Sequence, residues 1–583
     1  MAAAVSCEVL NQTPLTLLNS RVDMALADAG CADALANVQP AGRPQFGDYQ
    51  ANGVMTAAKV HRMDPRTLAQ KVVGLLDLAG IASKVDVAGP GFINITLAPE
   101  YIEGRLQVAS GRGDLAVPLT MRQRVVIDYS SPNLAKQMHV GHLRSTIIGD
   151  ALTRVLRLLG HEVVAQNHVG DWGTQFGMLT AYLLEAEQGP ESCNVLADME
   201  AVYRRAKRRF DEDPGFADRS REYVVRLQRG EPAVRALWQR FVDVSLSHCD
   251  DIYRALGSEL SRADVRGESA YNDDLEVVVA DLKERGISVT SEGAQVVFLN
   301  EFKNQNGDPA AYIVRKRDGG FVYATTDLAA IRYRVGRLEA DHLIYVVDAR
   351  QSRHFEQLFG VARKAGYAPV RTLLTHVEFG VVLGADGRPF KTRSGETIRL
   401  ADLLAEAVRR AFDLVTARSP ELPVDERSMI ARAVGIGALK YYDLSRNRKS
   451  DYLFDWSEML SFEGNTAPYL QYAYTRIRSV FRRAGDWDVS APIRITQPAE
   501  RHLALQLMRF ADTVHAVARD LMPHYLGSYL YDLAAAFTRF YEECPILTSE
   551  GAGRSGRLQW CRLTADTLRI GLRLLGIEVL ETM

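Results

Sequence analysis

The fold is decided by residues 125–146, which read VVIDYSSPNLAKQMHVGHLRST. Val125 to Tyr129 is a short apolar run, typical of a strand that is buried on both faces. A polar loop follows, and from about Leu143 to Leu159 the apolar residues recur at helical spacing. A strand, a loop and a long helix in this order predict the first unit of a parallel α/β sheet.

The loop between this strand and this helix carries groups that suit a nucleotide. Backbone N–H groups and the helix dipole at the start of a helix favour an anion such as phosphate. Gly141 allows the backbone to approach a flat ring, and His139 and His142 lie on one side of the first helical turn. We therefore expect both histidines to donate to one phosphate, although an isolated pair at this spacing would more often be a surface or metal-binding pair.

Further strands are predicted at Gln295–Leu299, Leu343–Val347 and Val377–Leu383, and they alternate with helical stretches. This alternation predicts a doubly wound, Rossmann-type parallel sheet that carries insertions. The stretch from about 180 to 290 is the predicted insertion.

Two other regions flank the sheet, as expected for a chain of 583 residues, which is too long for one hydrophobic core. Near the start, helical periodicity gives way to alternating runs at Val85–Val87 and Phe92–Leu97, which predict a small α/β module. From Leu400 onward the pattern is almost entirely helical and ends in a predicted α-helical bundle. The predicted boundaries are 1–112 for the module, 113–400 for the sheet, 401–460 for a helical connection and 461–583 for the bundle.

Composition excludes several classes of protein. Hydrophobic residues make up 47% and charged residues 24%, which is ordinary globular usage and argues against disorder. No run reaches the roughly 18 apolar residues of a membrane span, and the start has no secretory pattern, so we expect no membrane partner and a cytoplasmic location. The six cysteines include no CxxC pair, which argues against a structural metal. With a net charge of -2, any nucleic-acid surface must be local.

Residues 132–146, PNLAKQMHVGHLRST, resemble the HIGH-type signature of class I aminoacyl-tRNA synthetases. The match is to the version of arginyl-tRNA synthetases, in which a lysine shortly precedes the histidine pair. The resemblance implies an enzyme that uses ATP, with Mg²⁺ on its phosphates, to attach L-arginine to tRNA(Arg) through an arginyl-adenylate. Members of this family are usually monomers. Lys136, His139, Gly141 and His142 are then the expected ATP-binding residues, and the lysine and both histidines the expected catalytic ones.

Class I synthetases usually add a second loop with the pattern KMSK, whose lysines hold the phosphates. The corresponding segment here is residues 390–395, FKTRSG, which lacks a lysine in the fourth position. Many arginyl enzymes show this departure, and the resemblance implies that Lys136 substitutes for the missing group. Lys391 remains a further catalytic candidate, beside the alternative that it is a solvated loop lysine.

The resemblance also implies an arginine pocket that several segments build together. In residues 321–327, FVYATTD, Tyr323 and Asp327 face the same side if a helix starts there. A carboxylate can pair bidentately with a guanidinium, and a tyrosine can hydrogen-bond it or lie beside its plane. On spacing alone the pair would be commonplace. Other positions that match the family's arginine-binding residues are Asp128, Ser130, Asn133, His168 and Gln351, with Gln175 as a further wall residue.

Contacts with tRNA are expected in three places. Residues 464–479 interleave aromatics with arginines, as in proteins that stack unpaired bases, although a helix with buried tyrosines would show the same pattern. The candidates there are Tyr469, Gln471, Tyr474 and Arg476. By resemblance the N-terminal module contacts the tRNA elbow, and the basic run 204–209 is either a phosphate patch or a solvated helix face.

Two alternatives remain beside this interpretation. Another class I synthetase, such as the cysteinyl type, would normally need a zinc site that these cysteines do not provide. A catalytically inactive tRNA-binding paralogue would have no need of the histidine pair with Lys136, or of Tyr323 and Asp327.

Overall fold

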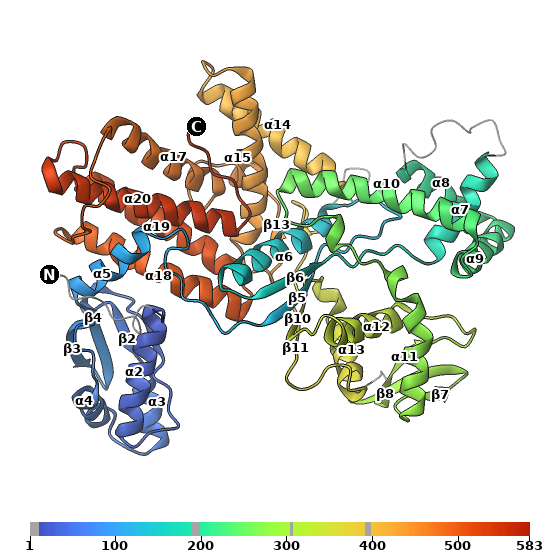
Figure 1. The fold of residues 1–583 in the computed structure, drawn as a ribbon, viewed down its shortest axis with the longest axis horizontal. Coiled ribbons are helices and arrows are strands. Elements are labelled where there is room, and N and C mark those ends of the chain that lie inside the picture. Colours follow the sequence, from blue (N-terminus) through green and yellow to red (C-terminus); the bar gives the residue numbers. More distant parts are fainter. Residues whose placement is uncertain (1–10, 188–198, 304–306, 391–397) are drawn as a thin grey trace.

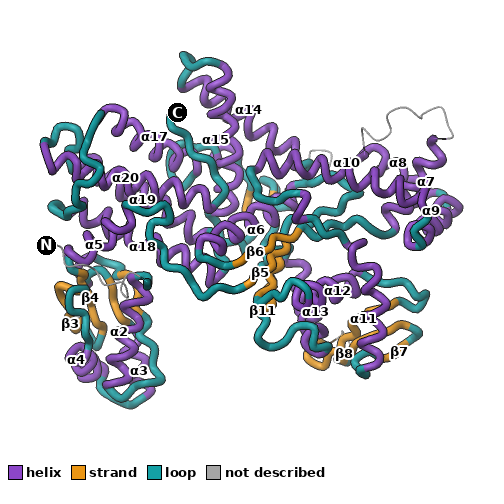
Figure 2. Tube along the Cα trace, viewed as in Figure 1, coloured by secondary structure: helices purple, strands orange, loops and turns teal. Residues whose placement is uncertain are grey.

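The computed structural model describes residues 11–187, 199–303, 307–390 and 398–583, which form an elongated molecule (Figure 1). The N-terminal module stands at one end, beside the helical bundle of the C-terminal region. The parallel sheet lies in the middle, and the helices inserted into it extend to the other end. Figure 2 shows how few strands the molecule contains beside its helices.

The N-terminal module is an antiparallel sheet of order β1-β2-β4-β3 packed against helices. The two predicted runs are neighbouring strands of this sheet. Helix α5 (Pro99–Ser110) leads out of the module and packs on the C-terminal bundle. The other elements are α2 (Pro14–Asp28), β1 (Val38–Pro40), β2 (Tyr49–Ala51), α3 (Gly53–Val60), α4 (Pro65–Leu75), β3 (Ala82–Ala88) and β4 (Phe92–Leu97).

The central sheet is parallel, with the order β11-β10-β5-β6. Its strands are β5 (Arg124–Asp128), β6 (Glu162–Gln166), β10 (His342–Tyr345) and β11 (Leu373–His376). Helix α6 (Val140–Leu158) follows β5, so the strand, loop and helix predicted from residues 125–146 are confirmed. Asp128, Gln166 and Tyr345 are in register, which brings the carboxyl ends of three strands together.

Of the three further strand predictions, one was a strand in another sheet than expected and one was wrong. Gln295–Leu299 lies in β8 (Ala294–Lys303), but this strand belongs to a separate antiparallel sheet with β7 (Val289–Ser291) and β9 (Pro309–Arg315). An apolar run indicates burial of a strand and does not identify its partners.

The predicted strand Val377–Leu383 is broken after β11. The backbone N–H of Val377 still donates to the carbonyl of Tyr345 in β10 at 2.7 Å. That of Gly380 donates to the carbonyl of Arg448, 2.9 Å away, so the stretch has left β10 for a distant loop. Only its end is extended, as β12 (Val382–Leu383), which pairs with β13 (Tyr452–Leu453).

Between β6 and β10 the chain leaves the central sheet for a long excursion. Four helices project from the sheet, and a second layer of helices covers the small antiparallel sheet (Figure 1). Their bounds are α7 (Thr174–Glu187), α8 (Met199–Glu212), α9 (Pro214–Gln228), α10 (Pro232–Leu256), α11 (Asn272–Glu284), α12 (Tyr323–Gly336) and, after β10, α13 (Ser352–Lys364).

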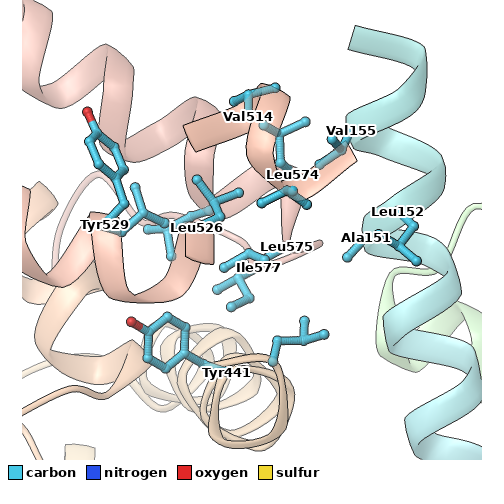
Figure 3. Packing of buried hydrophobic residues seen from close by; sticks show 14 of the residues in the cluster. Ala151, Leu152, Val155, Tyr441, Val514, Leu526, Tyr529, Leu574, Leu575 and Ile577 are labelled. Carbon is cyan, nitrogen blue, oxygen red and sulfur yellow. The ribbon is translucent and has the colours of Figure 1, made fainter. Parts of the chain in front are cut away.

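The C-terminal region is helical, as predicted. Its helices are α14 (Leu400–Arg418), α15 (Val424–Leu444), α16 (Trp456–Met459), α17 (Ala467–Ala484), α18 (Pro498–Asp520), α19 (His524–Glu543) and α20 (Gly551–Leu574). The bundle packs directly on α6, so the helix of the signature segment is covered by the end of the chain (Figure 3). Among the described residues, none of the helices combines the length and apolar composition that crossing a bilayer requires.

Candidate active site

The two histidines of the signature loop cap the start of α6 reciprocally. Nδ1 of His139 accepts from the Gly141 backbone N–H at 3.1 Å, and Nδ1 of His142 accepts from the His139 N–H at 3.0 Å. A neutral imidazole whose Nδ1 accepts must carry its hydrogen on Nε2. The capping geometry therefore assigns one tautomer to both rings and leaves two Nε2–H donors at the helix N-terminus.

The surroundings of both histidines favour the neutral form of the ring. Burial lowers the pKa of His139, with Lys136 and Arg350 adding to the effect. Burial and the neighbouring His139 ring lower the pKa of His142 to about 3. The pair therefore offers hydrogen-bond donors whose strength does not depend on capturing a proton.

Gly141 is required by the shape of this cap. A Cβ at this position would lie 2.9 Å from Cε1 of His139, closer than real Cβ contacts come. The flat ring that approaches the glycine in this structure is thus the imidazole of His139 itself.

The turn before the signature loop has an unusual backbone. Ser130 and Ser131 both have positive φ, at 69° and 44°. The backbone N–H of Ser130 donates to Ser145 Oγ at 2.9 Å, and that of Ser131 to Asn167 Oδ1 at 3.0 Å. Strained backbone of this kind persists only where the surroundings hold it, and it often marks functional sites. Here it turns the chain sharply out of β5 at the edge of the site.

Of the two candidate lysines of the phosphate site, the structure describes Lys136. Lys136 is exposed, and its Nζ lies 5.2 Å from the ring centre of Tyr203 in α8. It also lines a cavity of about 830 Å³ between the signature loop, α10 and α14. Lys391 lies outside the described residues. The residue before it, Phe390, stacks on Phe454 with 4.6 Å between ring centres, which anchors the entry to that segment.

The predicted pair Tyr323 and Asp327 opens helix α12, so the two residues share a face as expected. Asp327 lies between two imidazoles. Its Oδ2 is 2.8 Å from Nε2 of His354, and its Oδ1 is 4.0 Å from Nε2 of His168. Tyr323 remains 65% exposed, with its ring 5.0 Å from that of His354.

Asp128 and Ser130 are buried and already hydrogen-bonded. Arg334 donates to Asp128 at 2.7 Å; burial alone would raise the pKa of this carboxyl, but Arg334 and His168 hold it below its usual value. Ser130 Oγ lies 2.8 Å from Tyr253 Oη and accepts from Thr146 at 2.9 Å.

The remaining expected positions are less enclosed. Asn133 Oδ1 accepts from the backbone of Ala135, and its own backbone bridges to Gly170. Gln351 is exposed at the end of the 3-10 turn Ala349–Gln351, and Gln175 is half-buried near the start of α7.

Glu268 is a site residue that the sequence did not reveal. Its backbone N–H donates to the carbonyl of Val169 at 3.1 Å, which brings it beside the loop after β6. Burial, followed by the nearby Asp327 and Asp171, raises the pKa of Glu268 to about 7. Glu268, Asp171 and Asp327 thus lie close enough to interact electrostatically, and Asp171 and Asp327 also lie near His168.

Of the four candidate tRNA contacts, two are buried. Gln471 donates to the carbonyls of Ala433 and Glu578, and Tyr474 donates to Glu581 at 3.2 Å. Tyr469 is half-buried against Tyr531, and the guanidinium of Arg476 lies 4.4 Å from the ring centre of Tyr541.

A pocket of about 470 Å³ opens between α17, α20 and the end of the chain. It combines three arginines with aromatic rings, and of its lining only Tyr474 was among the expected contacts. Its lining residues are Tyr474, Arg478, Phe481, Trp487, Arg562, Ala565, Asp566, Arg569 and Glu581. The basic run on α8 has four exposed members, Arg204, Arg205, Lys207 and Arg208.

Three family models match the chain in sequence. They are the catalytic domain of class I (R) tRNA synthetases over residues 107–456, the DALR anticodon-binding domain over 470–583 and the arginyl tRNA synthetase N-terminal domain over 16–97. The chain belongs to the arginyl-tRNA synthetase family. The fold class and the family resemblance inferred from the signature segment are confirmed, and neither alternative is favoured.

Individual relatives are similar to this chain over nearly its whole length. The arginine–tRNA ligase of Laribacter hongkongensis is 60% identical over 97% of this chain and 99% of its own, and that of Chromobacterium violaceum is 59% identical over the same shares. Among solved structures, the arginyl-tRNA synthetase of Plasmodium falciparum is 28% identical with a TM-score of 0.85, covering 98% of this chain and 99% of its own. That of Thermus thermophilus is 26% identical with a TM-score of 0.80, covering 98% and 100%.

Proposed function

We propose that this protein attaches L-arginine to tRNA(Arg) in two steps, forming arginyl-adenylate and pyrophosphate from ATP and then releasing AMP. The observation that carries the proposal is that Asp171, Glu268 and Asp327 lie close together near the carboxyl edge of the sheet at which the histidine pair caps α6. Activation of arginine needs carboxylates that bind the guanidinium and a helix N-terminus that binds the phosphate of ATP, and both are present here.

In the first step the arginine carboxylate attacks the α-phosphorus of ATP, and pyrophosphate leaves. The transition state places extra negative charge on the phosphoryl oxygens. Nε2–H of His139 and Nε2–H of His142 stabilise that charge as preorganised donors at the N-terminus of α6. Mg²⁺ enters on the phosphates of ATP, and Lys136 and Lys391 add positive charge at the leaving pyrophosphate.

The guanidinium of arginine binds between Asp327 and Glu268. It offers five donors in one plane, and a site of carboxylates pairs them bidentately. Tyr323 covers the opening, and His168 orients Asp327. Asp128 and Ser130 shape the floor under the α-amino group, while Asn133 and Gln351 contact the backbone of the amino acid.

The tRNA binds along the C-terminal bundle and the N-terminal module. The pocket between α17 and α20 supports this assignment, because arginines beside aromatic rings are how proteins hold unpaired bases. Arg478, Arg562 and Arg569 supply the cations of that pocket, with Tyr469 and Arg476 beside it. The protein works as a cytoplasmic monomer, which sedimentation in the presence and absence of tRNA will test.

The deciding experiment is charging of total tRNA with each of the twenty labelled amino acids in the presence of ATP and Mg²⁺. Arginine alone should be attached. Attachment of another amino acid would contradict the pocket assignment and favour another class I synthetase. A protein that binds tRNA and charges nothing would be an inactive paralogue.

A further inference from the structure

The signature helix α6 and the end of the chain share one buried interface. Figure 3 shows Ala151, Leu152 and Val155 of α6 across from Leu574, Leu575 and Ile577. Leu574 ends α20, and the other two residues lie in the turn that follows. All six side chains are buried. The helix that begins with the histidine pair therefore rests on the turn that begins the C-terminal tail, residues 576–583.

A buried lysine fastens this interface. Lys440 of α15 is 1% exposed, and its Nζ donates to the carbonyl of Gly576 at 2.6 Å and to that of Leu256 at 2.8 Å. Asp150 of α6 lies beside the ammonium; burial lowers the pKa of Lys440 to about 8, and the carboxylate opposes that shift. Gly576 has a positive φ of 66°, and a Cβ there would lie 2.4 Å from Nζ. One ammonium of α15 thus joins the end of α10 to the C-terminal tail, near Asp150 of α6.

The same tail forms a wall of the bundle pocket. Beyond Gly576, the carboxylate of Glu581 accepts from Arg478 at 2.7 Å and from Tyr474 at 3.2 Å. All three of these side chains line the pocket. If RNA binding in the pocket shifts the tail, the shift would therefore also displace Gly576, the end of the tail to which Lys440 donates.

We propose that Lys440 is a positioning residue that couples occupation of the bundle pocket to the placement of α6 and its histidine pair. The inference rests on the proposed function. A buried ammonium that loses a carbonyl partner carries a large desolvation penalty. The hydrogen bond from Lys440 to Gly576 therefore either keeps the tail and the packed helix α6 moving together, or switches between two discrete arrangements. The lysine itself contacts neither substrate nor RNA.

The test compares Lys440→Met with Arg557→Met. Arg557 is a matched control, because it is a partly buried cation of α20 that contacts Glu500, the Pro545 carbonyl and Ser549 and does not reach α6. Single-turnover charging is measured at saturating tRNA(Arg), with tRNA affinity by filter binding and stability by urea unfolding. Lys440→Met should lower the charging rate about tenfold, within the range of typical coupling energies, with tRNA affinity changed less than about twofold. Arg557→Met should lower stability and leave that rate within about twofold.

A double-mutant cycle separates coupling from a loss of stability. Arg562→Ala, in the pocket, should slow charging about fivefold in the wild type and less than about twofold in the Lys440→Met background, because the connection is already broken. Gly576→Ala repeats the test with the lysine retained, should Lys440→Met fail to fold. The inference would be overturned if the effects of Arg562→Ala and Lys440→Met on the charging rate simply multiply in the double variant. It would also be overturned if Lys440→Met charges tRNA at the wild-type rate. Failure of the wild type to charge arginine would instead refute the proposed function.

Discussion

Arg334 donates a hydrogen bond to Asp128 at 2.7 Å, and both side chains are buried at the carboxyl edge of the sheet. The same guanidinium donates to Gln166 at 2.7 Å and lies 5.2 Å from the ring centre of Tyr345. Arg334 thus ties helix α12 to three neighbouring strands. Because α12 begins with the pair Tyr323 and Asp327, this ion pair fixes the orientation of the helix face that we propose binds arginine.

Breaking the buried pair of Arg334 and Asp128 should lower the free energy of unfolding far more than breaking the surface pair of Arg332 and Asp274. Arg334→Met leaves the Asp128 carboxylate buried without its cation and should lower the free energy of unfolding by about 3–5 kcal/mol. Arg332→Met, on the same helix, removes a half-exposed pair with Asp274 and should cost at most about 1 kcal/mol. Urea unfolding of both variants checks this, and equal costs would contradict it.

The histidine pair should act without titrating. His139→Ala and His142→Ala should each slow arginine activation about 10²–10³-fold, the usual effect of losing one preorganised donor. Since the pKa of both rings is lowered, the wild-type rate should show no loss from their titration at pH 7 and above. His342→Ala, at the opposite end of β10, should stay within about twofold. Pyrophosphate exchange with tRNA present measures all three, and a wild-type rate in either variant would remove the assignment.

Arginine binding should weaken as the pH falls below about 7. Glu268 has its pKa raised to about 7, so lower pH protonates it and removes the negative charge that a guanidinium needs. The KM for arginine should then rise, approaching about tenfold per pH unit, while the KM for ATP stays constant. Glu268→Gln should show a high KM that hardly depends on pH, whereas Glu276→Gln, on the exposed surface, should follow the wild type. A flat wild-type profile would mean that Glu268 is ionised throughout.

Asp327 should decide between arginine and its uncharged analogue. Asp327→Asn removes the carboxylate that faces His168 and His354 and should cost about 2–5 kcal/mol in kcat/KM for arginine. Citrulline, which lacks the charge, should lose much less, so the preference between the two substrates narrows. Competitive charging with both substrates measures this ratio. An unchanged ratio would place the guanidinium elsewhere.

The pocket between α17 and α20 should bind RNA through its arginines. Arg562→Ala should weaken tRNA binding by about 1–3 kcal/mol. If Arg562 contacts a phosphate, the slope of log affinity against log salt should also fall by about one. Arg539→Ala, an exposed arginine of α19 paired with Glu543, is the control and should leave both quantities unchanged. Filter binding across a salt series measures the affinity for tRNA and its salt dependence. If Arg562→Ala and Arg539→Ala give the same values, the pocket is not an RNA-binding site.

The signature segment alone was enough to predict the strand, helix and histidine pair at the start of the parallel sheet, because burial and helical spacing are local properties of the chain. The strand at Leu343–Val347 followed from the same rule. Gln295–Leu299 was also a strand, but it pairs with its neighbours β7 and β9 in a separate sheet, which an apolar run does not reveal. The prediction failed for Val377–Leu383, because the partners of that stretch lie far away in sequence.

Residues 125–146 by themselves indicated a phosphate site at the start of a helix, since the residue types and their spacing are written in the chain, whereas residues 321–327 indicated an arginine pocket only through their resemblance to the family. Only the tertiary structure decided how those groups are used. It brought Glu268 beside Asp327, fixed the tautomer of the histidines, engaged Asp128 with Arg334 and buried Gln471 in the bundle. Charge, pKa and accessibility depend on neighbours that folding supplies, and these neighbours come from segments that no local pattern connects.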